Sequence, residues 1–236
     1  MVSLGEIVSA ADRLRPSDYT AALVHCILQR ADWARGARVL DVGCGSGVLL
    51  AAAGAAGAAH LCGVDIEADA VSTTASLLDT LGHAGHRDVY RGEMFGPVAG
   101  RRFDLVLANL PHFPMNEAAV DGRLVTWSAG GPDGRRLMDP FIDGLAAHLA
   151  PEGRALVMHN SFIGVDRTRT AAARHGLTVD IADTVMVPLP QAKLAVMTPK
   201  VLAHETGRSI RRFGDYAFGE VSVLAITHAT RKGKST

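Results

Sequence analysis

The sequence predicts a single α/β domain built around a parallel sheet, and two features of the chain lead to that prediction. First, a short apolar run at 38–42 breaks into a turn with alternating glycines and continues into the alanine- and leucine-rich stretch 48–59. Strand, glycine turn and helix in this order form the entry unit of nucleotide-binding α/β folds. Second, another apolar strand, 59–65, ends in Asp65, about 20 residues past the glycines.

The glycine turn is the candidate ligand-binding loop. Gly43, Gly45 and Gly47 allow the backbone to turn tightly and to approach a ligand with no Cβ in the way. The helix that follows presents unpaired N–H groups at its start. Because a carboxylate at the position of Asp65 can accept both ribose hydroxyls, the sequence predicts a ligand that contains a nucleoside.

Length and composition limit the class of protein. The 236 residues suffice for one domain with at most a small appendage, and the formal net charge of +0 argues against a nucleic-acid partner. No apolar run is long enough to span a membrane, and the first residues do not form a signal peptide. We therefore expect a cytoplasmic protein without membrane contact, and the sequence leaves its oligomeric state open.

The three cysteines, Cys26, Cys44 and Cys62, do not indicate a metal site. They are odd in number and lack the spacing of zinc ligands. We expect three reduced, mostly buried thiols and no bound metal.

The N-terminal segment, 1–37, is expected to be helical and to cover the ligand site. Pro16 and Ser17 mark a helix start, and an apolar face follows. This helix would place Tyr19 and Thr20 close to the ligand. A helix that only packs on the domain is the alternative.

The rest of the chain alternates strands and helices. The 32-residue connection before the last strand, 188–219, is expected to be a helix-bearing, flap-like insertion near the substrate, because connections of this length are functional or locally helical. The tail, 231–236, is expected to be disordered. The expected elements are helices at 67–81, 137–149 and 166–175 and strands at 89–90, 103–109, 155–159, 178–187 and 220–228.

Two loops at strand ends carry further candidate residues. In such folds an acid after the third strand usually accepts a hydrogen bond from the adenine amino group, and Glu93 is in that position, with Met94 or Phe95 against the ring. The fourth strand ends at Asn109, beside the switch in strand order where ligands bind. The Asn109 side chain and the main-chain carbonyl of residue 110 can accept hydrogen bonds from a substrate N–H₂ group.

These motifs resemble class I S-adenosylmethionine (SAM) methyltransferases, and above all the HemK-type N-methyltransferases that modify glutamine side chains of translation release factors. The resemblance extends over 14–159 and is greatest to the short form of the family, which lacks an N-terminal helical domain. The matching segments are 15–20 to a Pro-(acid)-Thr segment, 41–47 to motif I, 92–97 to the motif after the third strand, and 126–134 with 138–141 to a Gly-Gly-x-x-Gly helix start.

The resemblance implies a SAM-dependent methyltransferase domain at 38–230, with a Rossmann-like sheet of about seven strands, an antiparallel last strand and helices on both faces. It implies SAM as cofactor and S-adenosylhomocysteine as product. It also implies catalytic roles for Asn109, Leu110 and His112. The implied cofactor contacts are Thr20, Asp41, Gly43, Cys44, Gly45, Gly47, Asp65, Ile66, Glu93, Met94 and Asn109, and the implied substrate contacts are Pro111, His112, Phe113 and Trp127.

One motif departs from the family. Where the family has Asn-Pro-Pro-Tyr, this chain has Asn109-Leu110-Pro111-His112. Leu110 frees a backbone torsion that proline would fix, and His112 replaces the aromatic ring beside the amide. The chemistry therefore stays open at this point.

The sequence is compatible with four different functions. The chain can methylate a nitrogen of a small molecule or of a protein side chain, with Asn109 orienting the nucleophile and His112 serving only as a platform. It can be a small-molecule O-methyltransferase with His112 as general base. It can methylate an adenine or guanine base of a nucleic acid, as related Asn-Pro-Pro-aromatic enzymes do; the neutral net charge argues against this, and the basic residues of 188–219 favour it. A SAM-binding protein without activity is the fourth, supported by Leu110 alone.

Overall fold

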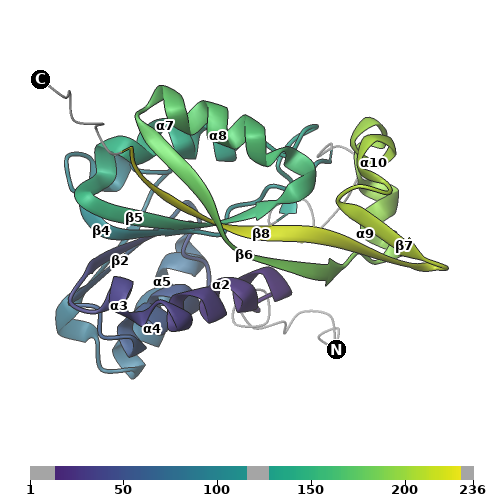
Figure 1. Ribbon diagram of the computed structural model, residues 1–236. Coiled ribbons are helices and arrows are strands. Elements are labelled where there is room, and N and C mark those ends of the chain that lie inside the picture. Colours follow the sequence, from purple (N-terminus) through teal and green to yellow (C-terminus); the bar gives the residue numbers. More distant parts are fainter. Residues whose placement is uncertain (1–13, 116–127, 230–236) are drawn as a thin grey trace, which may run out of the picture.

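A computed structural model of the chain describes residues 14–115 and 128–229. They form a mixed sheet in the order β3–β2–β1–β4–β5–β8–β6, with β7 paired to the outer part of β8. Figure 1 shows helices on both sides of this sheet. The strands are β1 (Arg38–Val42), β2 (His60–Asp65), β3 (Arg87–Arg91), β4 (Phe103–Ala108), β5 (Leu149–Asn160), β6 (Leu177–Pro188), β7 (Ile210–Phe213) and β8 (Tyr216–His228).

The helices follow the periodicity of the sequence. Helix α2 starts where expected, because the Ser17 hydroxyl accepts a hydrogen bond from the Thr20 N–H and the Thr20 hydroxyl accepts one from the Ser17 N–H. The helices are α2 (Asp18–Gln29), α3 (Ala31–Ala34), α4 (Val48–Ala55), α5 (Ala68–Thr80), α7 (Met138–His148), α8 (Val165–Arg174), α9 (Gln191–Val196) and α10 (Pro199–Glu205), with 3₁₀ turns η1 (Ala84–His86), η2 (Gly96–Val98) and η4 (Ser161–Ile163).

The predicted fold class is confirmed. Strands β3, β2, β1, β4 and β5 are parallel, and the last strand, β8, runs antiparallel between β5 and β6. The strand order reverses between β1 and β4, since β2 and β3 continue to one side and β5 to the other. The loops after β1 and β4 therefore open at the switch point, where ligands bind in sheets of this kind.

The central strands are apolar on both sides because both faces of the sheet are covered. Along β5, Leu156 and Met158 join the core under α2 and α4, whereas Ala155 and Val157 join the core under α7. In Figure 1, α7 and α8 lie on one face, and α2 to α5 lie on the other. This packing holds the carboxyl ends of β1, β2 and β4 fixed beneath the loops that they carry.

Three details differ from the sequence prediction. Strand β5 begins at Leu149, directly after α7, because Leu149 pairs with Phe103 across an irregular register. Strand β8 begins at Tyr216 rather than at Glu220. The additional strand β7 pairs with this longer β8, so the sheet has eight strands instead of seven.

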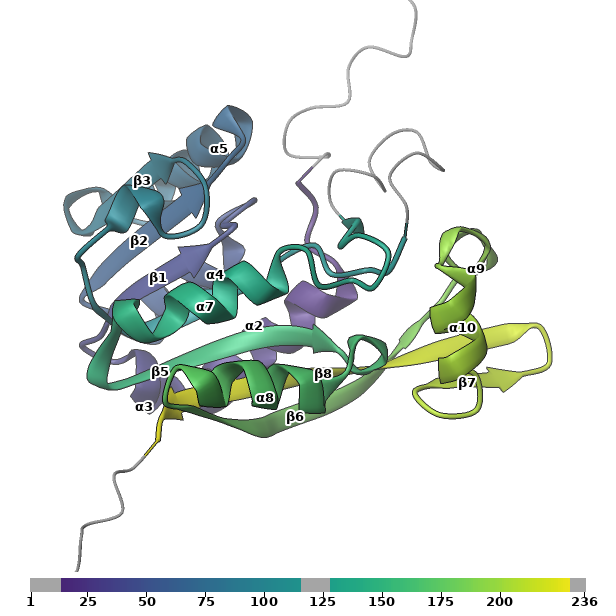
Figure 2. The same ribbon diagram turned by 90° about the horizontal axis from the view of Figure 1, so that it is seen from above.

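The segment between β6 and β8 carries α9, α10 and β7. Figure 2 shows α9 and α10 at one end of the sheet, beside the hairpin of β7 and β8. Leu194 and Met197 are buried in the main core, and the Thr198 N–H donates a hydrogen bond to the Pro114 carbonyl at 2.8 Å. The segment is therefore packed against the loop that follows β4.

Some expectations concern residues that the structure does not describe. The first part of the N-terminal segment, the tail 231–236 and Trp127 lie outside the described residues. Within the described parts, none of the helices combines the length and the apolar character that crossing a bilayer requires.

Candidate cofactor and substrate pocket

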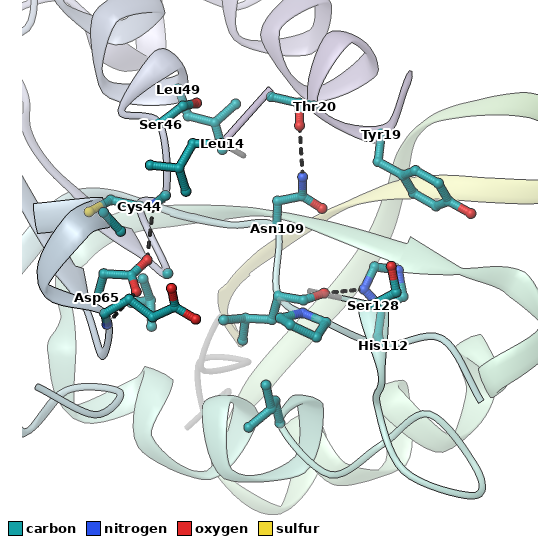
Figure 3. A pocket seen from close by; sticks show the side chains of 18 of the residues that line it. Leu14, Tyr19, Thr20, Cys44, Ser46, Leu49, Asp65, Asn109, His112 and Ser128 are labelled. Atoms are coloured by element: carbon teal, nitrogen blue, oxygen red, sulfur yellow. Dashed lines mark hydrogen bonds between the residues drawn. The ribbon is translucent and has the colours of Figure 1, made fainter. Parts of the chain in front are cut away.

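A cavity of about 580 Å³ opens at the switch point of the sheet. Its walls come from the start of α2, the glycine turn after β1, the ends of β2 and β3, and the loop after β4. Figure 3 shows Cys44 and Asp65 on one side of it and Tyr19 and His112 on the other, with Asn109 between them. A volume of this size is typical of cofactor and small-molecule sites.

The glycine turn leaves open space on the cavity side. Gly45 has φ +51°, and a Cβ built on it would meet no protein atom nearer than the Gly43 carbonyl oxygen, at 3.9 Å. Glycine adopts this left-handed conformation without the strain that a side chain adds. Since packing does not require a glycine here, the space is available to a ligand that approaches the backbone.

Asp65 is held in place by the loop that it faces. Its Oδ2 accepts a hydrogen bond from the Gly45 N–H at 2.9 Å, and its Oδ1 accepts one from the Glu67 N–H at 2.9 Å. A carboxylate has about four acceptor positions, so each oxygen keeps one for a ligand hydroxyl. Ile66, which is 63% exposed, lies against the cavity next to it.

The end of β3 contributes a constrained turn. Glu93 and Met94 line the cavity, and Met94 has φ +49°, the only positive φ of a non-glycine residue in the described parts of the chain. Such backbone conformations are costly and persist where the surroundings impose them. The turn therefore presents Glu93 and Met94 to the cavity in a fixed way.

Two predicted cofactor contacts need correction. Asp41 does not line the cavity, because its side chain is completely buried below the glycine turn. Gly47 does not line it either, and a Cβ there would lie 2.9 Å from the Thr74 Cα. Gly47 is a packing glycine between the turn and α5.

The Asp41 carboxyl group has an unusual environment. Both of its oxygens are buried without a hydrogen-bond partner among the described residues. Burial, together with the negative charge of Asp65, raises the pKa of Asp41 to about 8. The folded protein therefore holds a proton on Asp41 at pH values where the unfolded chain has lost it.

This shift predicts a pH-dependent gain in stability for Asp41→Asn in the ligand-free protein. As pH rises from about 4 to about 8, the unfolded parent protein releases the Asp41 proton and the folded one retains it, so the parent loses stability over this range. An amide does not titrate, so the stability of the variant relative to the parent should rise with pH over this range, by at most about 1.4 kcal/mol per pH unit. Denaturant unfolding at several pH values tests this, and an unchanged difference from pH 4 to pH 8 would contradict it.

Asn109 is oriented from the opposite wall. Its Nδ2 donates a hydrogen bond to the Thr20 hydroxyl at 3.1 Å, which joins the start of α2 to the end of β4 (Figure 3). Since the side-chain N–H₂ group is engaged there, the Asn109 Oδ1 is left as the free acceptor of a residue that lines the cavity.

The loop after β4 packs against the glycine-rich segment before α7 and forms hydrogen bonds with it. The Phe113 N–H donates to the Ser128 carbonyl at 2.7 Å, and the Gly130 N–H donates to the Phe113 carbonyl at 2.8 Å. A Cβ on Gly130 would lie 2.6 Å from the Cα of His112. The absence of a side chain at Gly130 thus allows the backbone at His112 to come this close.

His112 is buried and has one ring nitrogen engaged. Its Nδ1 is bonded to the Leu110 carbonyl, and because a carbonyl only accepts, Nδ1 must carry the proton. Burial lowers the pKa of His112 to about 4, against the opposing effect of this hydrogen bond. The neutral ring therefore presents an unprotonated Nε2. The Leu110 carbonyl, predicted as a free acceptor for substrate, already accepts this bond.

Two further polar atoms of cavity-lining residues are buried without a hydrogen-bond partner among the described residues. They are Tyr19 Oη and Asn160 Oδ1, and both residues line the cavity, as do Pro111 and Phe113. Asn160 was not predicted from the sequence. It ends β5, so the rule that ligands bind at the carboxyl ends of parallel strands could have identified it.

The remaining predicted residues fall as follows. Thr20, Gly43 and Cys44 line the cavity, in agreement with their expected positions. Residues absent from the prediction include Ser46 and Leu49 at the start of α4. Across residues 14–115 and 128–229, no group of three or more His, Cys, Asp or Glu side chains is arranged to hold a metal ion.

Comparison with known proteins gives relatives of several kinds. The family "Ribosomal protein L11 methyltransferase (PrmA)" matches residues 20–117. A candidate protein N5-glutamine methyltransferase of Methanocaldococcus jannaschii is 30% identical over 156 residues, which are 65% of this chain and 77% of that protein. A release factor glutamine methyltransferase of Xylella fastidiosa is 34% identical over 164 residues, which are 66% of this chain and 58% of that protein.

Ribosomal RNA enzymes are also similar. The ribosomal RNA small subunit methyltransferase C of Chromohalobacter salexigens is 33% identical over 132 residues, but the match spans 56% of this chain and only 34% of that protein. Among solved structures, a 16S rRNA methyltransferase of T. thermophilus, in complex with AdoMet and guanosine, has a TM-score of 0.57 at 16% identity. That similarity covers 91% of this chain and 44% of the other and concerns the fold.

Proposed function

The chain belongs to the HemK-type family of class I SAM-dependent methyltransferases, and from this premise we propose that it methylates a nitrogen atom of a small molecule or a protein side chain. The observation that carries the proposal is the hydrogen bond from Asn109 to Thr20, which leaves the Asn109 Oδ1 as an acceptor beside the cofactor site. The chain spans little more than half of the release factor enzyme, so the substrate of that relative is not assigned here.

The cavity residues fit SAM. The space beside Gly45 can receive the methionine portion against the backbone, the Asp65 carboxylate can accept the ribose hydroxyls, and Glu93 can accept from the adenine amino group. The bound cofactor supplies a methyl group on a positively charged sulfur. We assign these residues to cofactor binding on that basis.

Asn109 would act by orientation. Its Oδ1 can accept a hydrogen bond from a substrate N–H, which directs the nitrogen lone pair into the cavity. Holding two reacting groups in line contributes a large part of many enzymatic rate enhancements, provided that the geometry is fixed. Thr20 fixes it here, because its hydroxyl accepts a hydrogen bond from the Asn109 Nδ2 and so sets the orientation of the amide group.

His112 is a poor general base in this environment. A general base works best when its pKa is close to the working pH, whereas burial lowers the pKa of His112 to about 4. A nitrogen nucleophile needs alignment more than proton removal before the attack. We therefore favour N-methylation over the O-methylation that would use His112 as base.

The variant His112→Phe tests this choice. A flat ring remains beside the substrate, so we expect kcat to fall by less than about 10-fold and the parent rate to show no decline that follows the His112 pKa of about 4. His112→Ala, which removes the ring, should raise KM more than it lowers kcat. A loss of three or more orders of magnitude in His112→Phe, together with a parent rate that declines as the pH falls toward the His112 pKa of about 4, would favour the O-methyltransferase instead.

A further inference from the structure

Three cationic side chains, Arg15, Arg136 and Lys193, line the cavity, and Lys193 lies beside Tyr19. Lys193, on α9, lines the cavity together with Tyr19 and Phe113. The next residue, Leu194, is 4% exposed and packs in the main core. Because this buried leucine anchors α9, the position of Lys193 is set by the fold rather than by a freely moving surface segment.

The surroundings of Lys193 are aromatic. Its Nζ lies 5.2 Å from the ring centre of Tyr19 and 5.7 Å from that of Phe113. Aromatic faces attract an ammonium group, but they do not replace a counter-ion. Among the described residues, no carboxylate lies within 4.0 Å of Nζ. Burial lowers the pKa of Lys193, and Asp18 opposes this from a longer distance.

Three buried polar atoms of residues that line the cavity together with Lys193 divide into one donor and two acceptors. Burial raises the pKa of Tyr19, so its Oη keeps its hydrogen and can donate it. His112 Nε2 and Asn160 Oδ1 can only accept in the states described above. All three are buried without a hydrogen-bond partner among the described residues, and an unpaired buried polar group is destabilising.

A ligand that satisfies all of these groups must carry two kinds of polar function. The acceptors, together with Asn109 Oδ1, suit N–H groups on the nitrogen that receives the methyl group. Lys193 and the Tyr19 hydroxyl suit an anion. Tyr19 precedes Thr20, which holds Asn109, so the two subsites meet in adjacent residues of α2.

We propose that the substrate carries an anionic group, a carboxylate or a phosphate, close to the methylated nitrogen, and that Lys193 and the Tyr19 hydroxyl bind this group. The proposal rests on the proposed N-methylation and adds a substrate class to it. The carboxylates that line the cavity, including Asp65 and Glu93, follow β2 and β3, so the cofactor end is acidic and the substrate end is cationic.

Calorimetric titration of the full chain saturated with S-adenosylhomocysteine tests the proposal. The probes are pairs that differ in one anionic group: L-glutamine and L-glutaminamide, N-acetyl-Gly-Gln as free acid and as C-terminal amide, and O-phosphoethanolamine and ethanolamine. The first pair represents a free amino acid, the second the end of a peptide, and the third a phosphate. In at least one pair the anionic member should bind 10-fold more tightly or better, which corresponds to about 1.4 kcal/mol.

Substitutions distinguish a specific role of Lys193 in anion binding from a general effect of removing one positive charge. Lys193→Met should reduce the preference within that pair to 3-fold or less, and Lys193→Arg should retain most of it. Lys200→Met, on α10 and exposed, removes the same charge outside the cavity and should leave the preference unchanged. Equal binding within all three pairs, no measurable binding of any probe, or an unchanged preference in Lys193→Met would each overturn the proposal.

The methylated atom is determined separately. Equal binding within all pairs by the parent protein, with methyl transfer still directed to nitrogen, would reject the anion subsite and leave the proposed function standing. A preference for the anionic probe that depends on Lys193, combined with methyl transfer to oxygen, would support the anion subsite and reject the proposed N-methylation.

Discussion

Replacing Asn109 by alanine is expected to lower kcat about 100-fold or more, which corresponds to roughly 2.7 kcal/mol of transition-state stabilisation. The variant loses the Oδ1 acceptor that would orient the nucleophile, while the glycine turn and Asp65 remain intact. Affinity for S-adenosylhomocysteine should change far less than kcat. Steady-state kinetics with radiolabelled SAM, combined with calorimetry, give both quantities.

Thr20 provides a matched pair of controls for this effect. Thr20→Ser keeps a hydroxyl to accept the Asn109 N–H and should behave like the parent protein. Thr20→Val has a similar shape without the hydroxyl, so it should lower kcat in the same direction as Asn109→Ala but by less. Parent-like kcat values in both Asn109→Ala and Thr20→Val would exclude the orienting role.

The variant Asp65→Ala is expected to weaken cofactor binding by roughly 1–3 kcal/mol, which is about 5- to 150-fold in Kd. Two effects act together, because the ribose hydroxyls lose a charged acceptor and the glycine turn loses the bond between Gly45 N–H and Asp65. Calorimetric titration with SAM and with S-adenosylhomocysteine measures the change directly.

A carboxylate outside the cavity serves as control. Asp79 on α5 is paired with Arg87 and does not line the cavity, so Asp79→Ala should bind the cofactor like the parent protein. If Asp65→Ala retained the parent affinity, Asp65 would have no part in the cofactor site.

The sequence predicted those parts of the site that depend on local patterns. The segment from β1 through the glycine turn to Asp65 comprises only 28 residues. Its conformation follows from glycine torsions and from hydrogen bonds within this part of the chain. The position of Asn109 followed from the same logic, because the end of a parallel strand at the switch point faces the ligand.

Other parts depend on contacts between distant segments. Asp41 reads as a member of the glycine motif, yet the alternation of side chains along β1 directs it beneath the turn. Lys193 reads as one cation among several in 188–219, and only the packing of α9 on the loop after β4 brings it to the cavity. Strand β7 forms because β8 is longer than its apolar alternation indicates.

The central claim is that methyl transfer in this cavity goes to nitrogen and depends on Asn109. The most direct measurement uses SAM labelled with ¹³C in its methyl group and an acceptor that the protein methylates. The product is then examined by ¹H–¹³C NMR. The chemical shift of the transferred methyl carbon distinguishes attachment to nitrogen from attachment to oxygen. The account predicts an N-methyl signal that forms with the parent protein and with His112→Phe and is about 100-fold slower to form with Asn109→Ala. An O-methyl signal that disappears with His112→Phe would contradict it.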